Sequence, residues 1–313
     1  MIGRVSSRSG SDQRRALVLG NAGFIGRHLT DAISRSESFN YIEVAGFHAS
    51  NAPIPSFARA LEGRVDSQLL GKCSRPDVIF WAIGGASVGD SVRNPEHDRQ
   101  LSIPPLNDLL ELMANQWRGS HLVFLSSAAV YGASGSEETR TDSPLLAVSP
   151  YGESKVASER MIGESLEDSE YTLVRPFSVY GPGLRRQLIW EALAKLASGD
   201  LVFFGTGDEM RDWVHVNDLV QLLVQIGVRT DGFPRILNAG TGLGTSVRDV
   251  LGLLFQIAGS SSQPTFAGTK RIGDPDRLVA CPREQAPLTG YLKTTLNAGL
   301  RDYVRWHASL HRP

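Results

Sequence analysis

A tyrosine and a lysine stand four positions apart in the segment YGESK, which runs from Tyr151 to Lys155. Residues i and i+4 share one face of a helix, so we expect the phenol and the ammonium to lie side by side. A free phenol titrates near pH ~10, and a neighbouring ammonium stabilises the phenolate and lowers that pKa. The pair therefore indicates an acid–base device, although a solvated helix face is the simpler explanation when the two residues are taken alone.

A serine upstream adds a third group to this pair. Ser127 closes an apolar run in the segment FLSSAAVYG, which we predict to be a strand followed by a turn. Ligands of open α/β sheets bind beyond the carboxyl ends of the strands, so Ser127, Tyr151 and Lys155 are expected to face one bound cofactor. The phenol can then take a proton from a hydroxyl while hydride leaves the same carbon for a nicotinamide, with Ser127 holding the oxygen.

The elements that must hold these residues alternate as in an α/β protein. Apolar runs with the character of buried strands are separated by segments of helical length. Continuous apolar strands between helices are typical of a parallel sheet that is buried on both faces. The sequence therefore predicts a doubly wound, Rossmann-type sheet. The predicted strands are 16–20, 77–83, 121–127 and 171–176, and the predicted helices are 25–35, 105–116 and 151–167.

The pattern becomes irregular after about residue 180, where Gly-rich loops surround two helical segments at 188–198 and 246–258. We predict three parts from this change. A flexible arm occupies residues 1–14, a dinucleotide-binding Rossmann domain occupies 15–180, and a smaller α/β lobe is formed mainly by 181–313. The smaller lobe is expected to pack at the carboxyl edge of the sheet and to leave a cleft there.

Composition argues against several classes of function. The chain has 313 residues, of which 41% are hydrophobic and 21% charged, as in ordinary globular proteins. A net charge of −1 gives no electrostatic argument for nucleic acid or an anionic membrane as partner. Cys73 and Cys281 have no metal-ligand spacing, so we expect free thiols in a reducing cytoplasm and no metal site. We expect neither a signal peptide nor a membrane span.

Three glycines follow the first predicted strand in LVLGNAGFIGRHL, at Gly20, Gly23 and Gly26. Glycine lets the backbone turn sharply and approach a ligand closely, and the next helix offers free N–H groups and the positive end of its dipole. A strand, a glycine-rich turn and a helix in this order predict a site for the pyrophosphate of a dinucleotide.

The second strand lacks the acid that commonly binds the adenosine ribose of NAD. It lies in YIEVAGFHAS and ends at Gly46, Phe47 and His48, whereas Glu43 is interpreted as an ordinary strand residue. Without a carboxylate nothing repels a 2′-phosphate, and His48 and Arg64 could donate hydrogen bonds to one, as could the nearby Ser50. The cofactor is therefore predicted to be NADP or NAD, with NADP favoured.

Seven segments in register resemble the extended short-chain dehydrogenase/reductase family, in its nucleotide-sugar epimerase/dehydratase branch. They span residues 16 to about 275 and read GNAGFIG, DVIFWAIGGASV, SSAAVYG, YGESK, RPFSVYGPG, RDWVHVNDL and RIGD. A match to one of them would mean little, but all seven in order are specific. SSAAVYG and the YxxxK helix are most similar to 4-epimerases.

The resemblance implies a role for each matching residue. Ser127, Tyr151 and Lys155 take the catalytic positions, and Lys155 is also expected to hold the hydroxyls of the nicotinamide ribose. Arg211 and Arg271 take the positions that bind the pyrophosphate of the implied substrate, a nucleotide sugar, because guanidinium groups can chelate phosphate oxygens. A homodimer is implied as well.

Further contacts follow from the same resemblance. Asp218 is expected to fix hydrogen bonds within the smaller lobe, Trp213 is expected to pack, and Phe204 either packs or lines the base pocket. The implied cofactor contacts are Gly20, Gly23, Phe24, Ile25, Gly26, Gly46, Phe47, His48, Arg64, Val65, Ala82, Ile83, Gly84, Ser102, Leu125, Tyr151, Lys155, Pro176 and Phe177. The implied substrate contacts are Ser87, Ser127, Ser178, Val202, Phe204, Arg211, Arg271 and Asp274.

Several positions depart from the pattern of the family. Arg64 stands where an Asp usually contacts the adenine, and Ser102 and Ser178 stand where Asn is usual. Ala128 and Ala129 follow Ser127, where 4,6-dehydratases carry an Asp–Glu pair that eliminates water. Because neither alanine can transfer a proton, dehydration is not expected.

Three functions remain open on the sequence alone. The leading one is an epimerase that oxidises C4 of a nucleotide-linked hexose, lets the keto sugar rotate and returns hydride to the opposite face. The second is an NADPH-dependent reductase of a nucleotide-linked 4-keto-6-deoxyhexose, which the missing ribose carboxylate favours. The third is a dinucleotide sensor without turnover, which the retained Ser127, Tyr151 and Lys155 disfavour.

Overall fold

A seven-stranded parallel sheet forms the centre of the larger lobe. The computed structural model describes residues 14–49, 54–85, 88–132, 138–269 and 275–310. The strands lie in the order β10-β6-β5-β4-β1-β2-β3, and every pairing is parallel, which confirms the predicted doubly wound fold. Their bounds are β1 (Arg14–Leu19), β2 (Phe39–Gly46), β3 (Ala58–Glu62), β4 (Val78–Trp81), β5 (His121–Leu125), β6 (Tyr171–Pro176) and β10 (Ile236–Ala239).

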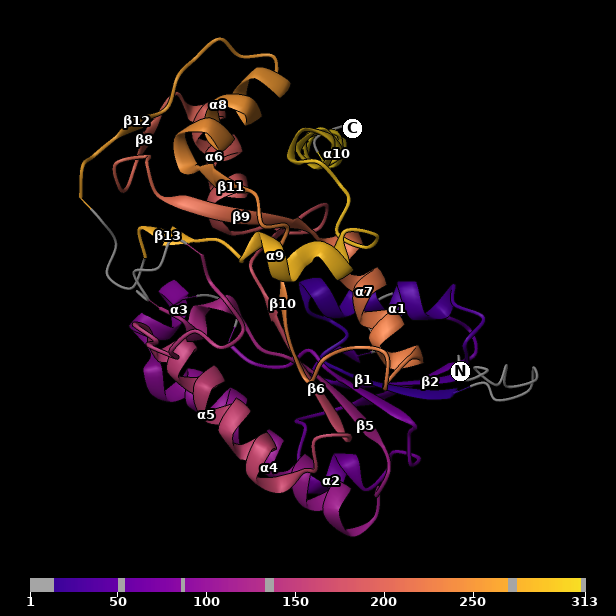
Figure 1. The fold of residues 1–313 in the computed structure, drawn as a ribbon. Helices are drawn as coiled ribbons and strands as arrows, with labels where there is room; N and C mark the ends of the chain where they lie inside the picture. Colours follow the sequence, from indigo (N-terminus) through magenta and orange to yellow (C-terminus); the bar gives the residue numbers. More distant parts are fainter. Residues whose placement is uncertain (1–13, 50–53, 86–87, 133–137, 270–274, 311–313) are drawn as a thin grey trace, which may run out of the picture.

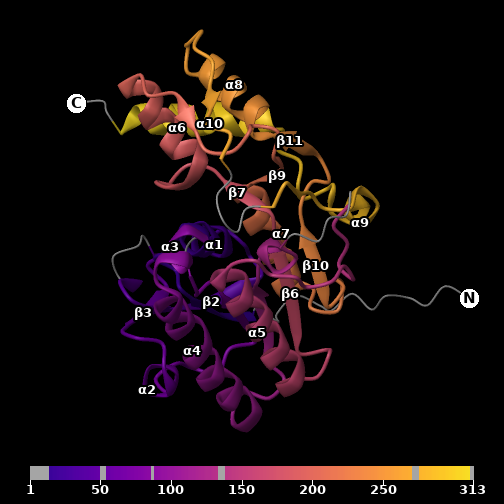
Figure 2. The ribbon, with the colours of Figure 1, turned by 90° about the vertical axis from the view of Figure 1, so that its left-hand side faces the viewer.

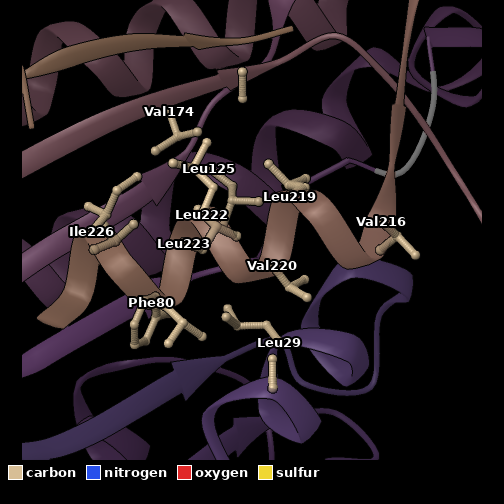
Figure 3. Close-up of a cluster of buried hydrophobic side chains, with 14 of the residues drawn as sticks. Leu29, Phe80, Leu125, Val174, Val216, Leu219, Val220, Leu222, Leu223 and Ile226 are labelled. Carbon is tan, nitrogen blue, oxygen red and sulfur yellow. The ribbon is translucent and has the colours of Figure 1, made fainter. Parts of the chain in front are cut away.

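Helices cover both faces of this sheet (Figures 1 and 2). One face carries α1 (Phe24–Ser34) and α7 (Val216–Val228), and the other carries α2 (Ser67–Leu70), α4 (Pro95–Asn115) and α5 (Pro150–Ser165). Figure 3 shows Leu219, Leu222 and Ile226 of α7 in the buried cluster that Leu125 of β5 and Leu29 of α1 also join. Strands buried on both faces explain the continuous apolar runs in the sequence.

Helix α4 begins ten residues before the predicted start at 105, at Pro95, and continues through Pro104 and Pro105. Proline in a helix interior removes a hydrogen bond and normally ends or kinks the helix. Here Asn94 caps the helix by accepting a 3.1 Å hydrogen bond from the His97 N–H, and α4 packs along α5. Tertiary packing therefore overrides the local preference. The extra turns carry Asp98 towards the carboxyl edge of the sheet.

The smaller lobe surrounds a mixed sheet and a two-stranded ladder. The sheet contains β7 (Ser178–Tyr180), β9 (Met210–His215), β11 (Gly244–Ser246) and β13 (Arg277–Leu278), and the ladder pairs β8 (Val202–Phe203) with β12 (Thr265–Phe266). Its helices are α6 (Gln187–Ser198), α8 (Val247–Ile257) and α10 (Leu296–Ser309). Short elements complete the chain: α3 (Val88–Arg93), η2 (Ala128–Val130), α9 (Pro282–Gln285) and η3 (Ala286–Leu288).

The larger lobe contains elements from both sides of the predicted boundary at residue 180. Strand β10 and helix α7 both follow that residue, yet they belong to the larger lobe. Of the predicted arm at 1–14, only Arg14 lies within the described residues, as the first residue of β1. None of the helices in the described ranges has the length and apolar character that crossing a membrane requires.

Candidate active site

The start of helix α5 fixes the tyrosine of the YGESK segment. Ser149 caps this helix by accepting a 3.1 Å hydrogen bond from the Gly152 N–H, and Pro150 occupies its first turn. A Cβ added to Gly152 would lie 2.7 Å from the Ala129 carbonyl oxygen, so glycine lets α5 press against the η2 turn. That contact brings Tyr151 into hydrogen-bond reach of Ser127, which caps η2.

Lys155 lies one turn further along the same face of α5 and is buried. Its Nζ donates hydrogen bonds to the Leu125 carbonyl at 2.8 Å and to the Ile83 carbonyl at 3.4 Å. The same atom lies 5.9 Å from the centroid of the Tyr151 ring. Backbone carbonyls at the ends of β5 and just beyond β4 thus hold the ammonium beside the phenol, as the spacing of the two residues predicted.

Burial sets the protonation of both groups. It lowers the pKa of the Lys155 ammonium to about 8, against the opposing charges of Asp98 and Glu159. It also raises the pKa of the Tyr151 phenol, with a further rise from Asp98; the Ser127 hydrogen bond and the charge of Arg186 oppose it. The expected lowering of the Tyr151 pKa is therefore wrong for this protein without ligands, because the loss of hydration outweighs the Ser127 hydrogen bond and the charge of Arg186.

The glycine-rich turn fits a dinucleotide pyrophosphate. Gly20 has a positive φ of 90°, and a Cβ added to Gly26 would lie 2.2 Å from the Gly20 carbonyl oxygen. Gly23 caps α1, whose first turn carries no acidic residue, so its first N–H groups and positive dipole end suit an anion. Phe24, Ile25 and Gly26 supply those N–H groups. The residues present therefore fit the phosphates of NAD or NADP.

The end of β2 offers no carboxylate to a ribose. Gly46 ends the strand with a φ of 145°, and the exposed Phe47 and His48 follow it. Glu43 is buried within the strand, where it accepts hydrogen bonds from the Ser74 N–H at 2.8 Å and from Arg59 at 3.0 Å. The interpretation of Glu43 as a strand residue is confirmed.

The remaining predicted cofactor residues gather around the carboxyl edge of the sheet. Ala82, Ile83 and Gly84 follow β4, while Leu125 and Pro176 close β5 and β6. Val65, Ser102 and Phe177 are buried, whereas Arg64, which follows β3, is exposed. Their contact with a cofactor stays a prediction.

The predicted substrate residues lie mainly in the smaller lobe. Arg211 is on β9 and donates a 2.9 Å hydrogen bond to the Met210 carbonyl, and Ser178 is on the adjacent β7. Val202 and Phe204 are exposed, at 52% and 59%. The predicted residues Ser87, Arg271 and Asp274 lie outside the described residues, as does Ser50.

Asp218 has a structural role, but not within the smaller lobe as the sequence indicated. It is buried on α7 and accepts hydrogen bonds from the Thr294 N–H at 2.6 Å and the Thr294 hydroxyl at 2.8 Å. Trp213 packs edge-to-face on Tyr180, with ring centroids 6.0 Å apart. Asp218 therefore joins α7 of the larger lobe to the segment before α10, rather than fixing hydrogen bonds within the smaller lobe, and Trp213 packs as expected.

Sequence reasoning missed a buried network behind the catalytic face. Glu159, four residues after Lys155, accepts a 2.5 Å hydrogen bond from the Ser126 hydroxyl and pairs with Arg175 at 2.6 Å. Arg175 also donates to the Tyr131 hydroxyl, which donates to Asn238 of β10 at 2.7 Å. The signal for Glu159 was present, because it continues the i, i+4 face of α5.

Two further charged residues near the phenol were missed. Asp98 of α4 and Arg186 at the start of α6 both act on the Tyr151 pKa, in opposite directions. Asp98 lay in a segment whose helix was not predicted, and Arg186 stands in a loop whose path no short motif encodes. Neither could have been placed from spacing.

Comparisons with known proteins agree with this geometry. The pattern described as "NAD dependent epimerase/dehydratase family" matches residues 16–240. The UDP-glucose 4-epimerase of Azospirillum brasilense is 31% identical over 332 residues, covering 95% of this chain and 93% of that protein. The UDP-glucose 4-epimerase of Mycolicibacterium smegmatis is 31% identical over 279 residues, covering 83% of this chain and 87% of that protein.

Two solved structures are similar over nearly the whole chain. The UDP-glucose 4-epimerase of Thermotoga maritima with UDP-glucose has a TM-score of 0.82 at 25% identity, covering 95% of this chain and 100% of that chain. The UDP-glucose 4-epimerase of Thermus thermophilus in complex with NAD has a TM-score of 0.81 at 25% identity, covering 94% and 99%. The family description and the name of the Thermus thermophilus structure mention NAD, so the predicted preference for NADP gains no support.

Proposed function

The chain belongs to the NAD dependent epimerase/dehydratase family, and from that premise we propose that it interconverts the C4 epimers of a UDP-hexose. Membership makes it an enzyme that acts on nucleotide sugars with NAD. The choice of C4 and of UDP rests on the similarity to UDP-glucose 4-epimerases and on the arrangement of three side chains.

One observation carries the proposal. The Lys155 ammonium is held by the Leu125 and Ile83 carbonyls within 5.9 Å of the Tyr151 ring, and Ser127 hydrogen-bonds the phenol of that tyrosine. The group stands at the carboxyl edge of the sheet, where ligands of such folds bind. A proton shuttle at this edge suits the oxidation of a secondary alcohol.

The residues divide the work as follows. Bound NAD supplies the hydride acceptor and donor. Tyr151 takes the proton of the C4 hydroxyl during oxidation and gives it back after the keto sugar has turned its other face. Ser127 orients the same oxygen, and Lys155 places positive charge beside the phenol and a donor towards the ribose of the cofactor.

The cofactor is proposed to be NAD. The lack of a carboxylate at Gly46 removes one ribose contact, but it adds no group that requires a 2′-phosphate. The mention of NAD for similar proteins supports NAD over NADP. We also propose that the protein is a homodimer. Light scattering of the purified protein measures its oligomeric state.

Dehydration is not proposed, because the η2 turn after Ser127 carries only Ala128, Ala129 and Val130. None of these side chains can protonate a leaving hydroxyl or remove a proton from carbon. The acid and base that elimination of water requires are therefore missing from this turn.

The test is to incubate the purified protein with UDP-glucose and with other UDP-hexoses, with and without added NAD, and to follow the C4 proton by NMR. We expect the C4 epimer to appear without net consumption of cofactor. Consumption of NADPH with a nucleotide-linked 4-keto-6-deoxyhexose, and no epimer from any UDP-hexose, would replace the proposal with a reductase. Tight dinucleotide binding without either activity would point to a sensor.

A further inference from the structure

A buried carboxylate stands beside the catalytic pair without a hydrogen bond on one of its oxygens. Asp98 of α4 is 4% exposed, and its Oδ2 atom has no partner among the described residues. A buried charge without hydrogen bonds is costly unless an opposite charge lies close to it.

Two glycines after β4 let this carboxylate approach the catalytic residues. A Cβ added to Gly85 would lie 1.7 Å from the Asp98 Oδ1 atom and 3.2 Å from Cδ2 of Tyr151. A Cβ added to Gly84 would lie 3.1 Å from Lys155 Nζ. The carboxylate, the phenol ring and the ammonium thus converge on one stretch of backbone, and any side chain there would separate them.

The other charges around this point are already balanced or exposed. Glu159, on the same face of α5 as Lys155, pairs with Arg175 of β6 at 2.6 Å. Helix α3 contributes Asp90 and Arg93, which are exposed and pair with each other. Each of these charges has a partner, although Glu159 still acts on the Lys155 ammonium in the same direction as Asp98.

Among the described residues, Asp98 and Arg186 are the charges that act on the Tyr151 phenol, and Asp98 also acts on the Lys155 ammonium. Arg186 at the start of α6 is exposed, whereas Asp98 is buried. Among the described residues, Asp98 is therefore the buried anion that faces the ammonium without a cation of its own. An exposed arginine is screened by water far more than a buried carboxylate.

We propose that Asp98 is a positioning residue for the proposed epimerisation, whose buried carboxylate is the counter-ion of the Lys155 ammonium. The inference rests on the proposed function for its catalytic meaning, but the charge relation is a property of the protein itself. Asp98 touches neither substrate nor reacting atoms in this assignment and acts through the other two residues.

The effect follows from the direction in which a negative charge moves its neighbours. A carboxylate favours the charged form of an ammonium and disfavours the charged form of a phenol, so it raises both pKa values. Asp98 acts in this direction on both residues, while burial opposes it at Lys155. Without Asp98, burial would leave a larger share of Lys155 neutral near neutral pH.

The test compares Asp98→Asn with the wild type and with Glu96→Gln as a matched control. Glu96 stands in the first turn of the same helix and is exposed. Its replacement by glutamine removes one negative charge, as Asp98→Asn does. In the protein without cofactor, NMR of the ¹³Cε atom of Lys155, assigned with Lys155→Met, measures its pKa directly. We expect Asp98→Asn to lower this pKa by about one unit or more and Glu96→Gln to leave it within about 0.3 unit.

The pH profile of turnover supplies a second readout. We expect Asp98→Asn to move the midpoint of kcat against pH to lower pH, since both pKa values fall together. A loss of rate at every pH with unchanged midpoints would show a merely structural role and overturn the proposal. Asp98→Ser, a second neutral variant, must shift the Lys155 pKa in the same direction, and it serves as the test if Asp98→Asn does not fold.

The two readouts separate this inference from the proposed function. A lowered Lys155 pKa in a protein that epimerises no UDP-hexose would contradict the function and leave the counter-ion assignment intact. An unchanged Lys155 pKa in an active epimerase would overturn the assignment alone.

Discussion

Tyr151 carries the proton in this account, so its hydroxyl must be indispensable to turnover and dispensable to cofactor binding. We expect Tyr151→Phe to lower kcat by about 10²–10⁴-fold, the usual contribution of a positioned acid or base, with NAD affinity nearly unchanged. Steady-state kinetics and calorimetric titration with NAD measure the two quantities. Tyr291→Phe removes the same atom from a residue packed on Phe233 outside the site, and it should change neither.

The lowered pKa of Lys155 leads to a prediction for stability as well as for catalysis. Its pKa in the folded protein is about 8, below the ordinary value of 10.5, so the folded state binds fewer protons than the unfolded state between these values. The free energy of unfolding must therefore rise with pH in that window, because the cost of burying the charge disappears as Lys155 loses its proton.

The measurement for Lys155 is urea unfolding of the wild type and of Lys155→Met at pH 8 and at pH 10. We expect the difference in unfolding free energy to shift in favour of the wild type by about 2 kcal/mol over this range, at 1.36 kcal/mol per pKa unit. Subtracting the variant removes the contribution of the other titrating groups. A flat difference would show that Lys155 keeps its ordinary pKa in the folded protein.

For individual residues, the sequence predicted where the reacting groups lie, but it predicted the wrong direction for the shift of the Tyr151 pKa. The i, i+4 spacing placed Tyr151 beside Lys155, and the strand end placed Ser127 at the same edge. The sign of the Tyr151 pKa shift depends on how completely water is excluded and on Asp98, which comes from a distant helix. The spacing of Tyr151 and Lys155 predicts neither the exclusion of water nor the position of Asp98.

The helix α1 and the strand β1 meet at a distance that only glycine permits. A Cβ at position 26 would lie 2.2 Å from the Gly20 carbonyl oxygen, a backbone atom that cannot move without disturbing the turn. We expect Gly26→Ala to lower the unfolding free energy by about 1–3 kcal/mol and to weaken NAD binding, as overpacking commonly does. Denaturation and NAD titration measure both effects.

Gly252→Ala is the matched control for that substitution. Gly252 also lies inside a helix, α8, but a Cβ there would meet nothing within 4 Å. Alanine is the better helix former, so this variant should be neutral or more stable by up to about 1 kcal/mol. If the two variants behaved alike, crowding at Gly26 would not be the cause.

Elements were predicted well where a periodic pattern decided them and poorly where packing did. The strands around β1, β4, β5 and β6 and the helix α5 all appear near their predicted positions. The predicted helix began only at Pro105, whereas α4 begins at Pro95 and packs along α5. That difference hid Asp98, which belongs to the added turns.

The chain passes between the two lobes more than once, and a buried network ties the returning strand β10 to the rest of the larger lobe. Residues beyond 180 return to the sheet as β10, and Asn238 of that strand is linked through Tyr131 to Arg175 and Glu159 behind the catalytic face. The sequence predicted a boundary near residue 180, but not this return of the chain, because a strand such as ILNA at β10 is too short to stand out.

The central claim is that hydride leaves C4 and returns to C4, while Tyr151 moves only the hydroxyl proton. Its most direct test is to convert UDP-glucose deuterated at C4 in ordinary water and to analyse the epimer by NMR and mass spectrometry. We predict that the deuterium is retained at C4 of the product. Formation of a C4 epimer that carries protium from water at that carbon would contradict the account, because the hydrogen would then have left as a proton.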